Sequence, residues 1–258
     1  MTAVPTTMRS THPPANSPSV DEAELAKFSA LAREWWDPNG KFRPLHRFNP
    51  VRLAFIRDIA ADHFGRDRAL LRPFKGKTLL DIGCGGGLLS EPMARQGFDV
   101  LGVDPSKKNI EIASAHSRGL GLPLTYRATT AEALAREDST FDLILNMEVV
   151  EHVADLPAFF AACGALLAPD GLMIVATLNR TLKSLALAKI GAEYVLRWLP
   201  PGTHDWNRFV RPDELTARLQ AAGLRVNRTQ GVAFDPLRWE WRLSPDTDVN
   251  YMVAAGRK

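Results

Sequence analysis

The stretch TLLDIGCGGGLL, residues 78–89, decides the fold of this chain. It joins a short apolar run to four glycines, at positions 83, 85, 86 and 87. An apolar run of this length is typical of a buried strand. Glycines directly after such a strand let the backbone turn sharply and approach a ligand where a Cβ atom would collide. We therefore expect a strand that leads through a ligand-binding loop into a helix.

Similar apolar runs recur along the chain and alternate with helical patterns. They predict strands at residues 78–83, 98–104, 123–128, 141–147 and 171–178. Strands that alternate with helices imply right-handed crossovers and a parallel sheet covered on both faces. A helix over 212–223 and strands at 224–230 and 248–256 are predicted to follow. The expected fold class is α/β, an open Rossmann-like sheet, mostly parallel with an antiparallel strand near the C-terminus.

Length and composition fit one domain. The chain has 258 residues, 45% of them apolar, which is enough for a single core. Residues 1–20 are rich in Thr, Ser and Pro without an apolar period, so we expect a disordered tail ahead of a domain over 21–258. The net charge of +3 is too small to indicate a nucleic-acid partner, although it allows attraction to an anionic membrane surface.

Cysteine content and hydropathy bear on location. Cys84 and Cys163 lie far apart, without the spacing of metal ligands. No apolar run approaches the ~20 residues that would span a bilayer. We therefore expect a soluble, reduced protein in the cytoplasm.

Two helices are predicted ahead of the first strand. One begins near Asp21, and the other runs from about Pro50 to Phe64, with the turn WWDPNG (35–40) between them. We predict that residues 21–75 form a helical lid that closes the ligand cleft and excludes water, with Trp35, Trp36, His46 and Phe48 as its aromatic part. Simple packing of these helices on the sheet is the alternative.

An acidic residue ends the second predicted strand. Asp104 lies 21 residues after Gly83, at the sheet edge where open α/β sheets bind ligands. From there a carboxylate can accept both ribose hydroxyls of an adenosine. The dinucleotide pattern G-x-G-x-x-G fails here, because its third glycine falls on Leu88 or Ser90. A nicotinamide oxidoreductase is therefore disfavoured.

The glycine loop fits another cofactor. The pattern D-x-G-x-G-x-G, formed by Asp81, Gly83, Gly85 and Gly87, resembles motif I of the class I S-adenosylmethionine (SAM)-dependent methyltransferases. The resemblance implies that the loop accommodates the methionyl part of SAM, which has no pyrophosphate to hold.

Two further cofactor contacts follow from this resemblance. Glu132 is implied near the adenine, and Met147 against the adenine or the sulfonium region. A solvated helix start for Glu132 and a plain core position for Met147 are the alternatives.

Uncommon strings outside the glycine loop narrow the resemblance. They are REWWDPNGKFRPLHRFNPVR (33–52), ATLNR (176–180), GAEYVLRWLPPGTHDW (191–206) and DVNY (248–251). Together with LDIGCGGG and EVVEHV, they resemble the O-methyltransferases of ubiquinone biosynthesis over about residues 20–258. The resemblance implies methyl transfer from SAM to a catechol-type hydroxyl of polyprenylated precursors, at both O-methylation steps, and a place in a ubiquinone biosynthesis complex. It also implies a cofactor contact from Arg52, for which a surface cation is the alternative.

The stretch NMEVVEH, residues 146–152, follows the fourth predicted strand and holds Glu148, Glu151 and His152. On a helix, their spacing would bring all three onto one face. Methyl transfer to a phenol requires an acceptor close to phenolate, yet a phenol with a pKa near 10 is ionised in only about one molecule in a thousand at neutral pH. A chelated divalent cation or a general base can supply the missing ionisation.

Three roles are open for these residues. The carboxylates would suit Mg²⁺, whereas His152 would suit manganese or zinc better; the resemblance implies a divalent cation, with Mg²⁺ first, at Glu148, Glu151 and His152. Without a metal, His152 would be the catalytic base beside the two carboxylates. A structural role is the third. Two other functions also stay open: methylation of another small hydroxylated aromatic, and a noncatalytic SAM-binding subunit, which would not need this face.

Residues 179–206 look like an insertion. Over residues 179–201 the cations Arg180, Lys183, Lys189 and Arg197 outnumber the single acid Glu193 among many apolar residues. This composition suits an amphipathic segment on anionic lipid, where a polyprenyl substrate would be found. We therefore predict peripheral association with the inner face of the membrane; packing against the substrate lid is the alternative.

Overall fold

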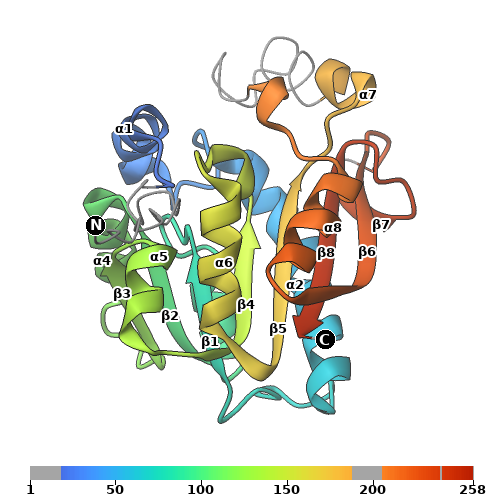
Figure 1. Ribbon diagram of the computed structural model, residues 1–258. Coiled ribbons are helices and arrows are strands. Elements are labelled where there is room, and N and C mark those ends of the chain that lie inside the picture. The colour runs from blue at the N-terminus through green and yellow to red at the C-terminus, as the bar shows by residue number, and fades with distance from the viewer. Residues whose placement is uncertain (1–18, 188–204, 239, 258) are drawn as a thin grey trace, which may run out of the picture.

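The computed structural model describes residues 19–187, 205–238 and 240–257, which are drawn in colour in Figure 1. They contain a sheet with the strand order β3-β2-β1-β4-β5-β8-β6-β7. The strands are β1 (Thr78–Ile82), β2 (Asp99–Asp104), β3 (Leu124–Ala128), β4 (Phe141–Met147), β5 (Leu167–Leu178), β6 (Leu224–Asp235), β7 (Glu240–Ser244) and β8 (Asn250–Arg257).

Strands β1 to β5 pair in parallel, whereas β8 pairs antiparallel with both β5 and β6. β7 adds an antiparallel edge to β6. The predicted fold class is therefore confirmed, with a larger antiparallel part than the one strand expected. β7 escaped prediction because three of its five residues are exposed and its burial alternates only weakly.

Helices cover both faces of the sheet (Figure 1). They are α1 (Glu22–Leu31), α2 (Arg43–Phe64), α3 (Ser90–Arg95), α4 (Lys107–Ser117), α5 (Ala131–Leu134), α6 (Leu156–Leu166), α7 (Leu182–Ser184) and α8 (Pro212–Ala221). One apolar core joins α6 and α8 to the sheet through Phe160, Leu166 and Leu219. A second core on the other face joins α2 and α3 through Ile56 and Met93.

Helix α2 begins earlier than expected. The sequence predicts a start near Pro50, but the helix starts at Arg43, with Pro44 in its first turn. A proline in the first turn is favourable because its missing N–H would have no partner there. Pro50 lies inside the helix and removes one hydrogen bond from it. The longer helix brings Phe48, Asn49 and Arg52 into buried positions on one rigid element.

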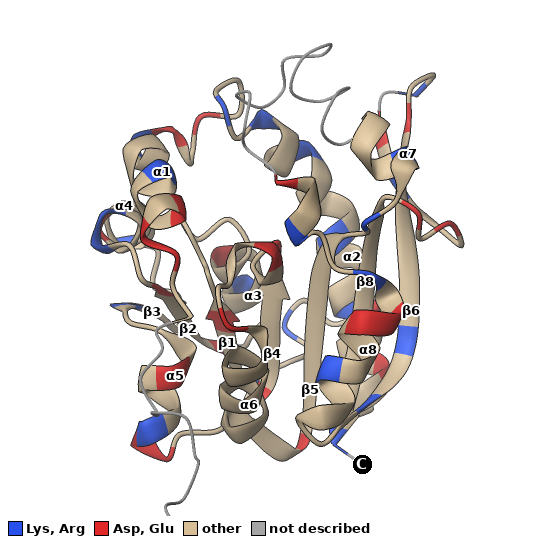
Figure 2. Ribbon diagram, turned by 45° about the horizontal axis from the view of Figure 1, so that its top comes forward, with Lys and Arg blue, Asp and Glu red and all other residues tan. Residues whose placement is uncertain are grey.

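The order of the strands reverses at β1, which has β2 on one side and β4 on the other. In open α/β sheets the ligand crevice lies at such a point, beyond the carboxyl ends of the strands. In Figure 1, α1 and α7 lie at this end of the sheet. Figure 2 tilts this end forward and shows acidic segments, in red, around it. No helix in the described ranges is long and apolar enough to cross a membrane.

Candidate active site

A cavity of about 1150 Å³ opens at the carboxyl ends of β1, β2 and β4. Its wall combines the strand ends with the N-terminal segment. Among the wall residues are Glu24, Phe28, Trp35, Arg52, Asp81, Gly83, Gly85, Asp104, Glu132, Met147, Glu148, Glu151 and His152. All the predicted site residues are described by the structure, and of these only Gly87 lies outside the wall.

The glycine loop after β1 requires its glycines. Gly83, Gly85 and Gly87 have φ values of 67°, 54° and 89°, a region that L side chains rarely adopt. A Cβ atom on Gly85 would collide with the indole of Trp35, and one on Gly87 would collide with the hydroxyl of Tyr126. The space that sequence reasoning gave to a ligand at these two glycines is therefore taken by protein side chains.

Asp104 at the end of β2 braces this loop. Its Oδ2 accepts a hydrogen bond from the Gly85 amide (3.0 Å), and its Oδ1 accepts from the Ser106 amide (2.8 Å) and from Asn109 Nδ2 (3.2 Å). Burial raises the pKa of Asp104, and these hydrogen bonds oppose the rise. A carboxylate has about four acceptor positions. Three are used within the protein, which leaves about one for a ligand hydroxyl.

Asp81 is the buried acid of the loop. It is 2% exposed and accepts a hydrogen bond from Ser90 Oγ (2.6 Å). Burial raises the pKa of Asp81 to about 7, against the smaller lowering effect of Ser90. A positive charge that enters the cavity would lower this pKa and favour the ionised form of Asp81.

The N-terminal segment reaches the predicted adenine contact. Ser19 Oγ donates a hydrogen bond to Glu132, which lies in the first turn of α5. Val20 forms an antiparallel bridge with Val153, and the Ala154 amide donates to the Ser19 carbonyl (2.8 Å). Glu132 is thus held by residues ahead of α1, a contact that the sequence did not indicate.

The helix considered for Glu148, Glu151 and His152 is not formed. β4 ends at Met147, which is 8% exposed in the cavity wall, and Glu148 has a φ of 60°. Only Val150–His152 forms a single 3₁₀ turn. The Glu148 amide donates to the Ala176 carbonyl (2.9 Å), which extends the β4–β5 ladder by one residue and prevents a helix from starting there. A left-handed, non-glycine residue at such a place stores backbone strain.

Glu148 faces a buried arginine. Its Oε1 lies 2.7 Å from a terminal guanidinium nitrogen of Arg52, whose side chain is 3% exposed and stacks over the ring of Phe48 at 3.8 Å. Burial lowers the pKa of Arg52, and Glu148 and Glu151 counteract the effect. Within the described part of the chain, Arg52 Nε has no hydrogen-bond acceptor, although it is buried. The guanidinium therefore keeps a donor for an anionic group in the cavity.

Glu151 and His152 turn to different partners. Thr177 Oγ1 donates to Glu151 Oε2 (2.8 Å), and His152 Nδ1 lies 2.8 Å from Glu24 Oε2. The hydrogen bond with His152 lowers the pKa of Glu24, against the effect of its partial burial. In the described ranges, no three His, Cys, Asp or Glu side chains are grouped so that they could hold a metal ion. The shared helix face behind the metal prediction is therefore not formed.

Sequence reasoning missed Glu24, Thr177 and Ser19. Glu24 lies 128 residues before its partner His152, and no local pattern connects two positions so far apart. The one available signal is the i, i+4 spacing of Glu24 and Phe28, which puts both on one face of α1.

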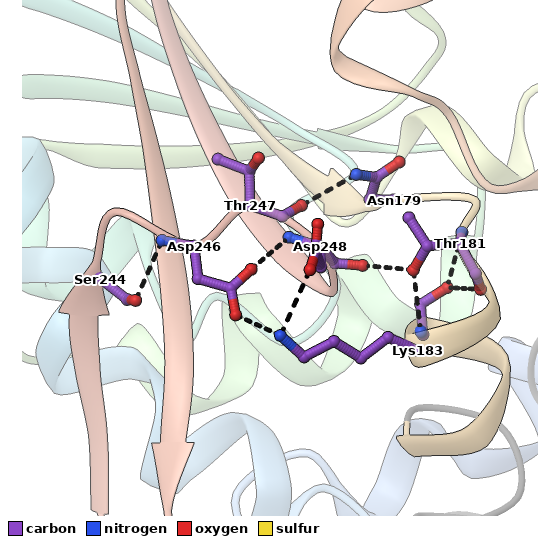
Figure 3. Close-up of polar contacts among 8 residues, drawn as sticks. Asn179, Thr181, Lys183, Ser244, Asp246, Thr247 and Asp248 are labelled. Carbon is purple, nitrogen blue, oxygen red and sulfur yellow. Dashed lines mark hydrogen bonds and ion pairs between the residues drawn. The ribbon is translucent and has the colours of Figure 1, made fainter.

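The start of the predicted insertion is tied to the loop between β7 and β8. Figure 3 shows Lys183 between the carboxylates of Asp246 and Asp248. Lys183 Nζ lies 3.4 Å from Asp248 Oδ2. Thr181 Oγ1 donates to the Asp248 carbonyl (2.6 Å), and Asn179 binds the same loop. Thr181 and Ser184 also form a capping box at the start of α7.

Two cations of this segment are paired with acids of the domain. Arg180 forms an ion pair with Glu214, and Lys183 forms one with Asp246 of the β7–β8 loop. The other charged residues of 179–201, Lys189, Glu193 and Arg197, lie outside the described residues. A count of the charges in the sequence therefore overstates the free positive charge of residues 179–187.

Comparisons with known proteins agree with this geometry. A family model described as a methyltransferase domain matches residues 56–229. A ubiquinone biosynthesis O-methyltransferase from Sinorhizobium fredii is 59% identical over 239 residues, which cover 93% of this chain and 96% of the relative. A relative with the same name from Chelativorans sp. is 60% identical and covers 94% of this chain and 96% of its own length. This chain belongs to the ubiquinone biosynthesis O-methyltransferase family.

Membership of the ubiquinone biosynthesis O-methyltransferase family confirms the predicted resemblance and the prediction of a SAM-dependent O-methyltransferase. Solved structures agree on the fold. The magnesium protoporphyrin IX methyltransferase from Synechocystis PCC 6803 with bound SAH has a TM-score of 0.60 at 20% identity, covering 90% of this chain and 94% of its own. The PH0226 protein from Pyrococcus horikoshii also has a TM-score of 0.60, at 16% identity, covering 90% and 99%. At these identities the likeness shows the fold alone.

Proposed function

We propose that the protein transfers the methyl group of SAM to a catechol-type hydroxyl of polyprenylated ubiquinone precursors, at both O-methylation steps. The observation that carries the proposal is one cavity that joins the glycine loop and Asp104 to a histidine paired with a carboxylate. The family of the chain supports the substrate class.

The cavity fits SAM through its polar groups. Arg52 offers a buried donor to the cofactor carboxylate, and Asp104 offers an acceptor to a ribose hydroxyl. Glu132 and Met147 lie in the same wall, where contacts to the adenine and the sulfonium are proposed. When bound, SAM supplies a methyl group on a sulfonium for in-line displacement.

His152 is the proposed base. It lies in the cavity wall, and its Nδ1 is engaged by Glu24, so Nε2 is the nitrogen available to take a proton from the acceptor hydroxyl. The aromatic residues Phe28, Trp35 and Phe48 line the cavity and would exclude water around the phenolate, as proposed for a lid over residues 21–75.

A divalent cation, with Mg²⁺ first, stays a separate proposal. Glu148, Glu151 and His152 do not fit a cation as they are arranged, because each has turned to a different partner. We therefore assign no step of the reaction to a cation. A cation site would require Glu148 to leave Arg52 and His152 to leave Glu24.

We also propose a peripheral position at the membrane and a place among other proteins of ubiquinone biosynthesis. The support is the polyprenyl tail of the substrate class, which partitions into lipid, and the exposed Leu182 and Leu187 at the start of the insertion. Cosedimentation of the full chain with anionic vesicles tests the first part.

The test of the function is transfer of labelled methyl from SAM to a short-chain prenyl catechol, with the matching monophenol as comparison acceptor. Label in the catechol at a rate well above the monophenol is the expected result. No label in either acceptor, while SAM still binds, would refute the substrate class and favour another aromatic acceptor or a noncatalytic SAM-binding role. A repeat after exhaustive chelation separates the base from the cation: full activity refutes the cation, and loss that Mg²⁺ restores refutes a metal-free base.

A further inference from the structure

Helix α1 brings two side chains against His152. Glu24 Oε2 lies 2.8 Å from His152 Nδ1, and the ring of Phe28 meets the imidazole edge-on, with 5.0 Å between centroids and 83° between planes. Glu24 and Phe28 are four residues apart, so they share one face of the helix. The hydrogen bond fixes the rotation of the imidazole in its plane, and the aromatic contact fixes its tilt.

The partner of Nδ1 determines where the imidazole proton lies. An ionised carboxylate only accepts hydrogen bonds, so Glu24 requires an N–H at Nδ1. The lone pair of a neutral His152 then lies on Nε2, on the other side of the ring. The other oxygen of Glu24, Oε1, lies 3.5 Å from Lys27 Nζ, one turn along the same helix. Lys27 thus helps to keep the carboxylate in place.

The position of α1 depends on polar contacts at its two ends. Asp21 caps the helix and pairs with Arg208 at 2.7 Å. Near the other end, the hydroxyls of Ser29 and Ser106 lie 2.7 Å apart. α1 itself has no buried residue. The partly buried Leu31 at the end of the helix packs beside a small apolar cluster around Trp35, and together with this packing the polar contacts at both ends place Glu24 against His152.

We propose that Glu24 is a positioning residue that holds His152 in the Nδ1–H tautomer with Nε2 towards the methyl acceptor, and that docking of α1 over the cavity is what orients the base. The inference rests on the proposed function for its kinetic part. Where a carboxylate orients a metal-bound histidine, its loss costs about 10- to 100-fold in affinity or activity, and we expect an effect of this order at His152.

A double-mutant cycle tests this role. Glu24→Ala should lower kcat for the prenyl catechol by about 10- to 100-fold, with KM for SAM changed less than about threefold. In a His152→Ala background, Glu24→Ala should change kcat by less than about twofold, because the group that it positions is already gone. Equal losses in both backgrounds would assign Glu24 to the structure of the cavity and overturn the inference.

Two further variants sharpen the cycle. Glu24→Gln keeps an acceptor oxygen for Nδ1–H without the charge, so its kcat should lie between those of wild type and Glu24→Ala. Glu22→Gln is the matched control, since Glu22 is an exposed acid in the same first turn of α1. It should stay within about twofold of wild type, and a loss equal to that of Glu24→Gln would contradict the inference.

The tautomer can be read without turnover. Long-range ¹H–¹⁵N spectra of protein labelled at its six histidines, with His152 assigned by its loss in His152→Gln, should show the proton on Nδ1. Glu24→Ala should move it to Nε2 or to a mixture. A proton on Nε2 in the wild type would overturn the inference whatever the kinetics. If the wild type methylates neither acceptor, only the proposed function fails, because the spectra still report on the pair.

Discussion

The two halves of the cavity are built in different ways. In the cofactor half, Asp104 binds groups 2, 5 and 19 residues away in the chain, so the β1 loop and the end of β2 form one local unit. In the acceptor half, Glu151 and His152 bind partners 26 and 128 residues away. The difference teaches that the brace of the glycine loop can form locally, whereas Glu132 of the cofactor half and His152 of the acceptor half both require the N-terminal segment to dock.

The largest effect is expected in the acceptor half. His152→Ala removes the proposed base, so kcat for the prenyl catechol should fall by about 10²- to 10⁴-fold, with the Kd of SAM within about threefold of wild type. Steady-state kinetics and calorimetric titration with SAM measure the two quantities. His63→Ala is the control, because His63 binds the Asp170 carbonyl (2.9 Å) and is not among the residues that line the cavity. An unchanged kcat in His152→Ala would remove the base from the mechanism.

A substitution in the cofactor half should weaken the binding of SAM and leave kcat nearly unchanged. Asp104→Asn replaces one of the two acceptor oxygens of the loop brace with a donor NH2 group, so the Kd of SAM should rise by about 10- to 100-fold. At saturating SAM, kcat should stay within a few fold of wild type, because the acceptor half is intact. Asp99→Asn, at the exposed start of the same strand, is the matched control. If kcat at saturation fell as far as affinity did, the two halves would not be separable.

The smallest predicted effect is the contribution of Asp81 to the pH dependence of folding stability. The pKa of Asp81 is raised from about 3.8 to about 7 in the folded state, so between these values the folded protein binds more protons than the unfolded chain. The contribution of Asp81 is therefore most favourable at low pH and declines as pH rises towards 7. From pH 5 to pH 7 the decline should be about 2 kcal/mol, and Asp81→Asn should abolish it.

Urea denaturation of wild type and Asp81→Asn at pH 5 and pH 7 gives this difference directly, with Asp99→Asn again as control. The same pH dependence in wild type and Asp81→Asn would show that Asp81 is ionised in the folded protein at both pH values. The surroundings of Asp81 would then stabilise its ionised form more than its burial indicates.

The fold and the cofactor half were predictable from the sequence for physical reasons. Buried parallel strands need near-continuous apolar runs, and a loop with positive φ needs glycines, so both leave a local pattern such as that of residues 78–89. The family strings added the substrate class. What the glycine pattern could not reveal is the role of Trp35, whose indole takes the space beside Gly85.

The acceptor half was only partly predictable. The residue types of Glu148, Glu151 and His152 were identified, but a helix was assumed for their arrangement. The hydrogen bond from the Glu148 amide to Ala176 depends on the register of β5 against β4, which no short pattern encodes. The same holds for Glu24, because its place opposite His152 depends on how α1 docks.

Helix α1 contributes no buried side chain to either core of the sheet. Its partly buried Leu31 packs beside a third, smaller apolar cluster, so we expect the docking of this helix to affect turnover much more than folding. A natural variant that weakened its docking would accumulate in the cell at normal abundance and melt at a normal temperature. Screens that score expression or thermal stability would pass over such a variant, and the loss would show only in the amount of methylated product.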